Sequence, residues 1–394
     1  MSNVFVPKIP YGMRDFLPRE SSRKRAIEGS LGSLFSRWGY DEVITPTIEY
    51  LETLTVGAGP DAQASMFKFF DKNNRILALR PDMTTPIARV AATRLRESAL
   101  PLKLFYLTNV FRYEQAQAGR QCEFYQAGVE LFGAGDSTAD AEVIALAAEA
   151  MLTAGLQSFQ ISLGQVEFIN GVMDECELTI EQRQQIKQAM VTRDLVGLGE
   201  ILSASGLCRS GQKLLQQIPL LHGREDMLKQ AYSMVATATA RSALDNLADI
   251  YSLLNNYGVA KYVNFDLGII RDFDYYTGMV FEGYTPGLGF PLCGGGRYDN
   301  MVSSFGVDCP ATGFALGIER ILLALERQEI ELAAKNRDVY IGWQNGKLTE
   351  AIGEAGRRRK AGQTVELGLV HQSQTEAAAS QTAKGYRQLV YLGG

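Results

Sequence analysis

The stretch that most constrains the fold is residues 262–299, where two strand patterns enclose a polar segment. Before that segment, apolar residues occupy every second position, at Val263, Phe265, Leu267 and Ile269. After it, Thr277–Tyr284 supplies a second run of strand-forming residues. Period-two patterning on both sides of a polar turn predicts two neighbouring antiparallel strands. The turn itself carries Arg271, Asp272, Asp274, Tyr275 and Tyr276, so we expect hydrogen-bonding groups to gather at the mouth of a sheet.

The length and composition predict a soluble globular protein of two or three domains. The chain has 394 residues, of which 46% are hydrophobic and 21% charged, and it contains no apolar run of the roughly 18 residues that a membrane span needs. The N-terminus shows no charged region followed by an apolar stretch, so we expect no secretion signal. The five cysteines are scattered and form no CxxC pair. That pattern favours a reducing cytoplasm over a zinc site or a disulfide framework.

The positions of the histidines and the distribution of charge exclude further kinds of functional site. The only two histidines, His222 and His371, lie far from residues 262–299 in the sequence, which excludes a histidine-based catalytic device or metal site in that stretch. We therefore expect no metal and no cofactor. From residue 335 onward there are nine Lys/Arg and five Asp/Glu, which gives a net charge of +4. Because the whole chain has a net charge of −5, residues 1–334 carry −9. A net negative charge over residues 1–334 is unfavourable for binding a long nucleic acid, because such binding depends on positive groups that neutralise phosphates.

The order of the expected elements suggests two sheet-forming halves around a helical insertion. A helix over 21–38, a hairpin over 66–79 turned by residues 71–74, and a helix over 87–97 come first. Strands over 104–109 and 123–132, a helix over 139–154 and a strand over 159–163 follow. The pattern from about 165 to 257 is helical, with a capping box at Thr179–Gln182. After a linker near 335–337, strands and helices alternate as a small α/β unit. We place the domains at 1–334 and 335–394.

The predicted strand 123–132 carries a row of polar side chains on a face that we expect to be buried. Gln126 and Glu130 share a face with Phe124 and Gly128 in the strand 123–132. Because buried polar groups need partners, this row indicates either a polar small-molecule pocket or a solvated sheet face. Asp82 and Thr84 stand before a helix, where such residues are commonly caps. From the residues alone, both interpretations of each position stay open.

Five segments in order resemble the class II histidyl-tRNA synthetases and their paralogues, the regulatory subunits of ATP phosphoribosyltransferase. The resemblance covers nearly the whole chain. Arg271–Glu282 and Gly294–Asp299 resemble the two histidine motifs, and residues 21–46 occupy the place of motif 1. Residues 111–130 resemble motif 2, and Gly313–Arg320 resembles motif 3.

The resemblance implies an α+β fold with a six-stranded antiparallel sheet flanked by helices, a helical insertion and a truncated anticodon-binding-like C-terminal domain. It also implies a homodimer formed through motif 1. The residues that align with a free-histidine site are Asp82, Thr84, Arg112, Gln126, Glu130, Arg271, Tyr275 and Tyr276. The arginines that match an ATP-phosphate grip, here vestigial, are Arg112, Arg120 and Arg320.

Two functions compete within this resemblance. The first is a histidine–tRNA ligase, and the presence of Arg112, Arg271 and Arg320 agrees with it. The second is the regulatory subunit, and three departures favour it. Arg80–Pro86 has the regulatory form, the motif 2 loop lacks the usual Arg-Pro and carries Cys122 in place of a second arginine, and the C-terminal unit is short. Losing arginine and proline removes a charge and a rigid element from the loop. A binding module for another amino acid is a third alternative.

We therefore expect a non-catalytic subunit, with no catalytic residues of its own, that binds a short catalytic subunit of ATP phosphoribosyltransferase. Histidine would be its allosteric ligand, and tRNA and membranes would not be partners. Its location would be the cytoplasm.

Overall fold

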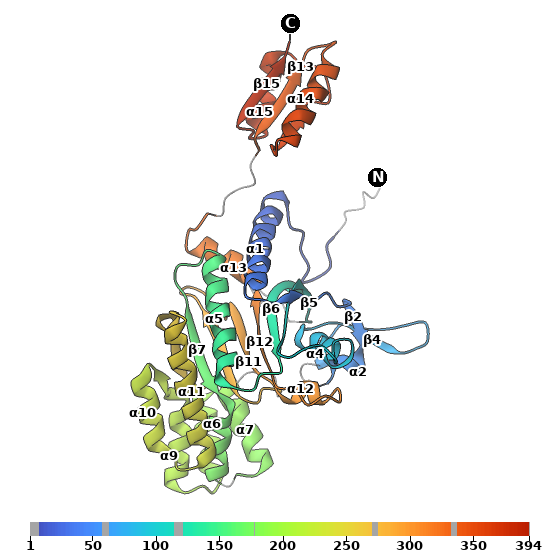
Figure 1. Ribbon diagram of the computed structural model, residues 1–394. Coiled ribbons are helices and arrows are strands. Elements are labelled where there is room, and N and C mark those ends of the chain that lie inside the picture. The colour runs from blue at the N-terminus through green and yellow to red at the C-terminus, as the bar shows by residue number, and fades with distance from the viewer. Residues whose placement is uncertain are drawn as a thin grey trace, which may run out of the picture. The chain divides into compact units, whose positions relative to one another are not determined.

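The computed structural model of the chain describes residues 8–56, 63–113, 121–176, 178–269, 275–331 and 337–393. The chain divides into two compact units, Met1–Glu331 and Leu332–Gly394, which are treated separately below (Figure 1).

The first unit is built on a mixed sheet that has nine strands among the described residues. In spatial order the strands are β1 (Asp41–Glu42), β5 (Leu102–Phe111), β6 (Glu123–Phe132), β12 (Ala311–Gly317), β11 (Cys293–Arg297), β10 (Met279–Tyr284), β7 (Gln160–Gln165), β9 (Val263–Asp266) and β8 (His222–Gly223). The class II synthetase-like α+β architecture is confirmed, but the six-stranded antiparallel sheet is wrong. Strands β5 to β7 in this order do pair antiparallel. In contrast, β1 pairs parallel with β5 and β9 pairs parallel with β7, while β8 at the edge pairs antiparallel with β9. Of the added strands, β1 and β8 have two residues each, too few for a period-two pattern to reveal.

The prediction that the strands flanking residues 267–278 are neighbours is also wrong. β9 and β10 both exist, but β7 lies between them: Ile161 of β7 pairs with Val263 on one side and with Gly283 on the other. The pattern correctly predicts two strands, and it contains no information about an intervening strand from far earlier in the chain.

The hairpin over 66–79 is confirmed and belongs to a second, three-stranded sheet. β3 (Lys68–Phe70) pairs antiparallel with β4 (Ile76–Leu79), which also pairs with β2 (Ile48–Tyr50). In the turn, Asp71 accepts hydrogen bonds from the backbone N–H groups of Asn73 and Arg75, and Asn74 adopts a left-handed φ of 60°. Beyond the sheet, α4 (Thr84–Thr93) begins earlier than expected, so that Pro86 lies in its first turn.

The helices of the first unit cover the sheet and form the insertion. The helices outside the insertion are α1 (Pro18–Arg37), α2 (Leu51–Leu54), α4, α5 (Ser137–Thr153), α12 (Asn300–Ser303) and α13 (Ile318–Arg327). The insertion contains α6 (Val166–Glu175), α7 (Ile180–Val191), α8 (Leu195–Ala204), α9 (Arg209–Gln217), α10 (Glu225–Met234) and α11 (Ala238–Asn256), and Figure 1 shows it gathered beside β7. The predicted capping box at Thr179 and Gln182 is confirmed. Among the described residues, no helix is both long and apolar enough for a membrane span.

A buried ion pair joins the middle of the large sheet to α5. The guanidinium of Arg297, at the end of β11, donates to both carboxylate oxygens of Asp140 in α5 at 2.8–3.2 Å. It also donates to the carbonyl oxygens of Ala134 and Asp136 and to Asp299. Both partners are nearly inaccessible, with 1% of Asp140 and 6% of Arg297 exposed. Arg297 therefore holds the start of α5 against the sheet, and its role here is structural.

The second unit contains the five elements that its sequence predicts. They are β13 (Val339–Trp343), α14 (Leu348–Lys360), β14 (Val365–Leu367), α15 (Gln374–Ala383) and β15 (Gln388–Leu392). The strands pair parallel in the order β14-β13-β15. Val339, Ile341 and Trp343 of the central strand form a core with Ala351 and Ala355 of α14.

We predict that replacing Arg297 by Met destabilises the first unit by about 3–5 kcal/mol, because the Asp140 carboxylate stays buried without its partner. The joint replacement Arg297→Met with Asp140→Leu is expected to cost less than Arg297→Met alone. Chemical denaturation followed by tryptophan fluorescence and circular dichroism measures both changes.

The control is Lys229→Met, which breaks an exposed pair with Asp226 on α10 and is expected to leave the unfolding midpoint unchanged. Equal losses in the single and joint variants of the buried pair would contradict the assignment, because the loss would then come from side-chain packing alone.

Candidate functional site

A cavity of about 380 Å³ opens on the face of the large sheet opposite the Arg297–Asp140 pair. Side chains alternate along a strand, so Arg297 and its cross-strand partner Thr312 face α5, while Gly296 and Gly313 lie on the other face, where Gly313 lines the cavity. The lining residues come from the segment before α4, from β5, β6, β11, β12 and α13, and from the start of α1. Eight of the residues that the sequence predicts line this one cavity: Asp82, Thr84, Arg112, Gln126, Glu130, Tyr275, Tyr276 and Arg320. Arg120 and Arg271 lie outside the described residues.

Glycines in adjacent strands leave the space that the cavity occupies. Glu130, Gly313 and Gly296 form one cross-strand row on β6, β12 and β11, and Gly128, Ala315 and Gly294 form the next. A β-carbon at Gly313 would lie 2.1 Å from Glu130 Oε2, and one at Gly296 would lie 2.8 Å from the Tyr276 ring. Any larger residue in these positions would displace the acid or the aromatic wall. The alternate glycines at 294, 296 and 313 are the sequence signal that could have located this floor.

Glu130 is the buried acid of the site, with 1% of its surface exposed. Thr84 Oγ1 donates to its Oε1 at 2.9 Å, and the Tyr298 hydroxyl donates to its Oε2. The pKa of Glu130 is raised to about 8: burial is the largest cause, the hydrogen bonds from Tyr298 and Thr84 lower the pKa, and the nearby charge of Asp82 raises it. At neutral pH the carboxyl is thus poised to ionise when a cation comes beside it.

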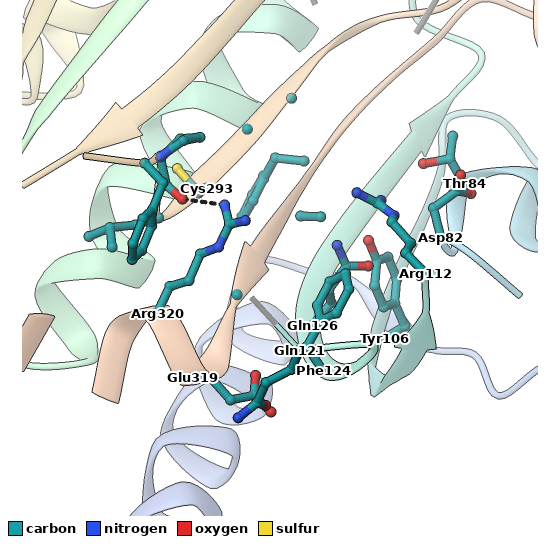
Figure 2. A pocket seen from close by; sticks show the side chains of 18 of the residues that line it. Asp82, Thr84, Tyr106, Arg112, Gln121, Phe124, Gln126, Cys293, Glu319 and Arg320 are labelled. Atoms are coloured by element: carbon teal, nitrogen blue, oxygen red, sulfur yellow. Dashed lines mark hydrogen bonds between the residues drawn. The ribbon is translucent and has the colours of Figure 1, made fainter. Parts of the chain in front are cut away.

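Asp82 and Arg112 form the polar end of the cavity together with Thr84 (Figure 2). Burial raises the pKa of Asp82, and the charge of Arg112 and the N–H groups of Thr84 and Thr85 lower it. Asp82 Oδ1 accepts a hydrogen bond from the Thr85 N–H at 3.4 Å. Arg112 Nε donates to the Pro81 carbonyl at 2.8 Å, which fixes the guanidinium at this end. Asp82 thus accepts a hydrogen bond from an N–H group in the first turn of α4 and also lines the cavity, although the N-cap residue of α4 is Met83.

Gln126 presents an unused hydrogen-bonding group to the cavity. The residue is 9% exposed, and no group among the described residues donates to its Oε1. A buried amide oxygen without a donor is costly, and a ligand N–H group would satisfy it. The polar row on β6 therefore lines a pocket, and the alternative of a solvated sheet face is wrong.

Four tyrosines form an aromatic wall around these polar groups. The ring centroids of Tyr275 and Tyr276 are 4.7 Å apart, and those of Tyr275 and Tyr298 are 5.9 Å apart. Tyr106, 1% exposed, places its hydroxyl 2.4 Å from where a Gly128 β-carbon would be. The sequence-based list missed Tyr106 and Tyr298. Tyr298 lies within a motif that resembles a histidine motif, so its position was available from the sequence.

The opposite end of the cavity is formed mainly by Arg320 and its neighbours (Figure 2). Arg320 Nη1 donates to the Pro291 carbonyl at 2.6 Å, and its guanidinium lies 5.1 Å from the centroid of the Phe290 ring. Glu319 accepts two hydrogen bonds from the Tyr125 N–H, at 2.9 and 3.1 Å. Arg320 and Asp82 therefore lie at different ends of one cavity.

Chemically, the cavity suits a small ligand that has both N–H donors and an apolar or aromatic part. Two carboxyl groups and an unpaired amide oxygen can accept from N–H groups, and the tyrosine rings provide an apolar wall with polar tips. In the part of the chain that the structure describes, no three His, Cys, Asp or Glu side chains gather to hold a metal ion.

Comparisons with known proteins agree with this architecture. The family model of histidyl-tRNA synthetase matches residues 12–321. A histidyl-tRNA synthetase from Nostoc has the same fold, with a TM-score of 0.85 at 20% identity over 99% of this chain and 92% of that one.

Relatives that are similar over nearly the whole chain identify the family more narrowly. An ATP phosphoribosyltransferase regulatory subunit from Moorella thermoacetica is 44% identical over 98% of both chains, and one from Desulforamulus reducens is 41% identical over 100% of this chain and 97% of that one. A crystal structure described as an ATP phosphoribosyltransferase regulatory subunit/histidyl-tRNA synthetase from Bacillus halodurans aligns over 100% of both chains, with a TM-score of 0.89 at 35% identity. The chain therefore belongs to the histidyl-tRNA synthetase-like family of ATP phosphoribosyltransferase regulatory subunits.

Proposed function

We propose that this chain is the regulatory subunit that a short-form catalytic subunit of ATP phosphoribosyltransferase requires for the first step of histidine biosynthesis. It would catalyse nothing itself and would carry feedback inhibition by histidine to its partner, a glycosyltransferase. The names of its relatives support this role, and the geometry of the cavity supports histidine as the ligand.

The observation that carries the proposal is the buried set Glu130, Asp82 and Gln126 beside the tyrosine wall. Histidine presents an α-ammonium and an imidazole N–H, which match two carboxyls and an orphan amide oxygen. Arg112 and Arg271 would face the α-carboxylate, and Tyr275 and Tyr276 would cover the ring. Thr84 would hold Glu130 in place through its 2.9 Å hydrogen bond.

Regulation then follows from linkage. If histidine bound here changes the affinity of the catalytic partner for its ligands, those ligands must alter histidine affinity by the same factor. The partner we propose lacks a regulatory domain of its own, so the histidine response of the complex would come from this chain.

The alternative is a histidine–tRNA ligase, and one observation favours it: Arg112 and Arg320 both line the cavity, as an ATP-phosphate grip would require. We propose that these arginines, with Arg120, are vestigial ATP ligands. The loop between β5 and β6 lacks the Arg-Pro pair of the synthetases, and the first domain is acidic. Both features are unfavourable for handling tRNA, although the second unit would derive from an anticodon-binding domain.

We further propose a homodimer formed through the motif 1 region, residues 21–46, and we extend the proposed interface to the β2-β4-β3 sheet that follows it in the chain. One face of the β2-β4-β3 sheet carries only apolar or aromatic side chains, all of them partly exposed: Ile48, Tyr50, Phe69, Leu77 and Leu79. Ile44, before β2, is 87% exposed. A contiguous exposed apolar face marks an interaction surface, and a second copy would cover it symmetrically. The five free cysteines agree with our proposal of a cytoplasmic location.

Mixing this chain with a short catalytic subunit tests the proposed role. We expect phosphoribosyl transfer from phosphoribosyl pyrophosphate to ATP to appear only in the mixture and to fall when histidine is added. Each subunit alone is the control. A mixture that is no more active than the catalytic subunit alone would refute the regulatory role.

The same preparation is assayed for histidine-dependent exchange of pyrophosphate into ATP and for tRNA charging. We expect neither. Robust exchange together with charging would establish the ligase instead.

Histidine affinity is expected to depend on Glu130 and on pH. The pKa of Glu130 is about 8 without ligand, so the carboxyl is mostly protonated at pH 7, and pairing with a cation lowers its pKa. Binding at pH 7 therefore releases protons, and affinity rises with pH toward 8, by at most tenfold per unit. Glu130→Gln is expected to weaken binding by about 10- to 100-fold and to reduce the proton release. Calorimetry in buffers of different ionisation enthalpy measures both.

The matched control is Glu123→Gln, on the same strand. Glu123 accepts a hydrogen bond from Asn109 at 2.7 Å and does not line the cavity. Histidine binding with unchanged affinity and proton release in Glu130→Gln would place the ligand elsewhere.

The dimer is tested with Ile48→Glu and Leu77→Glu, whose charges would lie in the proposed interface. We expect sedimentation analysis to show two copies for the wild type and one for these variants, with unchanged circular dichroism. Ile180→Glu, at a 72% exposed apolar residue of α7, is the control and should remain dimeric. Variants that stay dimeric would exclude this face.

A further inference from the structure

Two cysteines lie beside each other in the helical insertion, apart from the cavity. Cys176 ends α6 as its C-cap residue, and Cys208 precedes α9 as its N-cap residue. Both are free thiols, and α7 and α8 lie between them in the chain. The function proposed above uses neither of them.

A single glycine leaves the gap that the two sulfur atoms share. A β-carbon at Gly211, in the first turn of α9, would lie 3.2 Å from Cys176 Sγ and 3.7 Å from Cys208 Sγ. The sulfurs thus border one small space, which a methyl group would fill. Glycine is unfavourable inside a helix relative to alanine, so its presence here is consistent with a need for that space.

The two thiols have different environments, which suit different steps of thiol chemistry. Cys208 is exposed, and its Sγ lies 3.1 Å from Ser210 Oγ. The Ser210 hydroxyl and the Gly211 N–H lower the pKa of Cys208. Cys176 is half-buried, and burial raises its pKa. Cys208 is therefore the better nucleophile toward a reagent from solvent, and Cys176 is placed to react second.

We propose that Cys176 and Cys208 form a reversible disulfide when a low-molecular-weight disulfide oxidises the protein. The Cys208 thiolate attacks one sulfur of the reagent, whose S–S bond breaks and whose other half leaves as a thiolate. Cys176 then loses its proton and attacks Cys208 Sγ, and the second half of the reagent leaves. One dithiol and one disulfide become one protein disulfide and two small thiols, so two electrons pass from the protein to the reagent.

The remaining cysteines do not share this arrangement. Cys122, Cys293 and Cys309 are buried, with 2%, 3% and 6% of their surfaces exposed. The reaction is thus expected to be selective for the pair in the insertion. The bond would close a ring around α7 and α8 and tie the end of α6 to the start of α9, which restricts the unfolded chain and stabilises the insertion.

The test incubates the full-length chain with oxidised glutathione and maps peptides by mass spectrometry without reduction. We expect one intramolecular link between the peptides of Cys176 and Cys208, two fewer free thiols, a rise of several degrees in the Tm of the insertion, and full reversal by dithiothreitol. Glutathione that stays on Cys208 with no link to Cys176, or a link between Cys208 residues of two molecules, would overturn the proposal.

Three variants separate the effect of proximity from general thiol reactivity. Gly211→Ala keeps both thiols but fills the shared gap, so we expect the link to form several-fold more slowly than in the wild type. Gly199→Ala, in α8 with its nearest side-chain atom 3.9 Å away, should react at the wild-type rate. Cys176→Ser should stop at glutathionylated Cys208. Equal rates in Gly211→Ala and Gly199→Ala would show that the gap plays no part.

Discussion

The architecture of the first unit depends on the buried pair of Arg297 and Asp140. The guanidinium satisfies a carboxylate, two backbone carbonyls and Asp299 at the same time, so its charge is compensated on several sides. A buried ion pair contributes little net stability against an apolar replacement, but losing one partner is costly. In this protein the Arg297–Asp140 pair serves to position the chain. It fixes the end of β11 against α5 and so determines the direction of the next side chain.

That next residue is Tyr298, which turns to the opposite face and donates to Glu130. A step of one residue along the chain, from Arg297 to Tyr298, thus connects the structural side of the sheet to the cavity side. The cavity in turn exists because glycines of β12 and β11 leave room beside Glu130 and Tyr276. Among the described residues, two neutral hydroxyl groups donate to this buried acid, and its burial keeps the pKa high. A site of this kind favours a cationic ligand, which supports the proposal that the chain binds free histidine.

The residues that were selected through motifs lie together in the structure. The strands that were predicted to be neighbours from their pattern alone do not. Asp82, Gln126 and Glu130 line one cavity although they lie on two separate segments, the turn before α4 and strand β6. In contrast, the strands on either side of residues 267–278 are separated by β7. Tyr106 was missed because a tyrosine in a strand pattern is ordinarily a core residue. Its contact with the ligand space comes from its partner across the strand, Gly128.

The sequence by itself determined the helices and most strands, the hairpin at 71–74, the α/β unit after residue 337, and the family. These depend on periodicity, caps and turn residues, which are local in the chain, or on motifs read in order. Only the tertiary structure decided the nine-stranded order, the role of Arg297, the glycine floor and the shared gap between Cys176 and Cys208. Each of these joins residues from distant segments, and a pattern within one segment does not specify which distant segment packs against it.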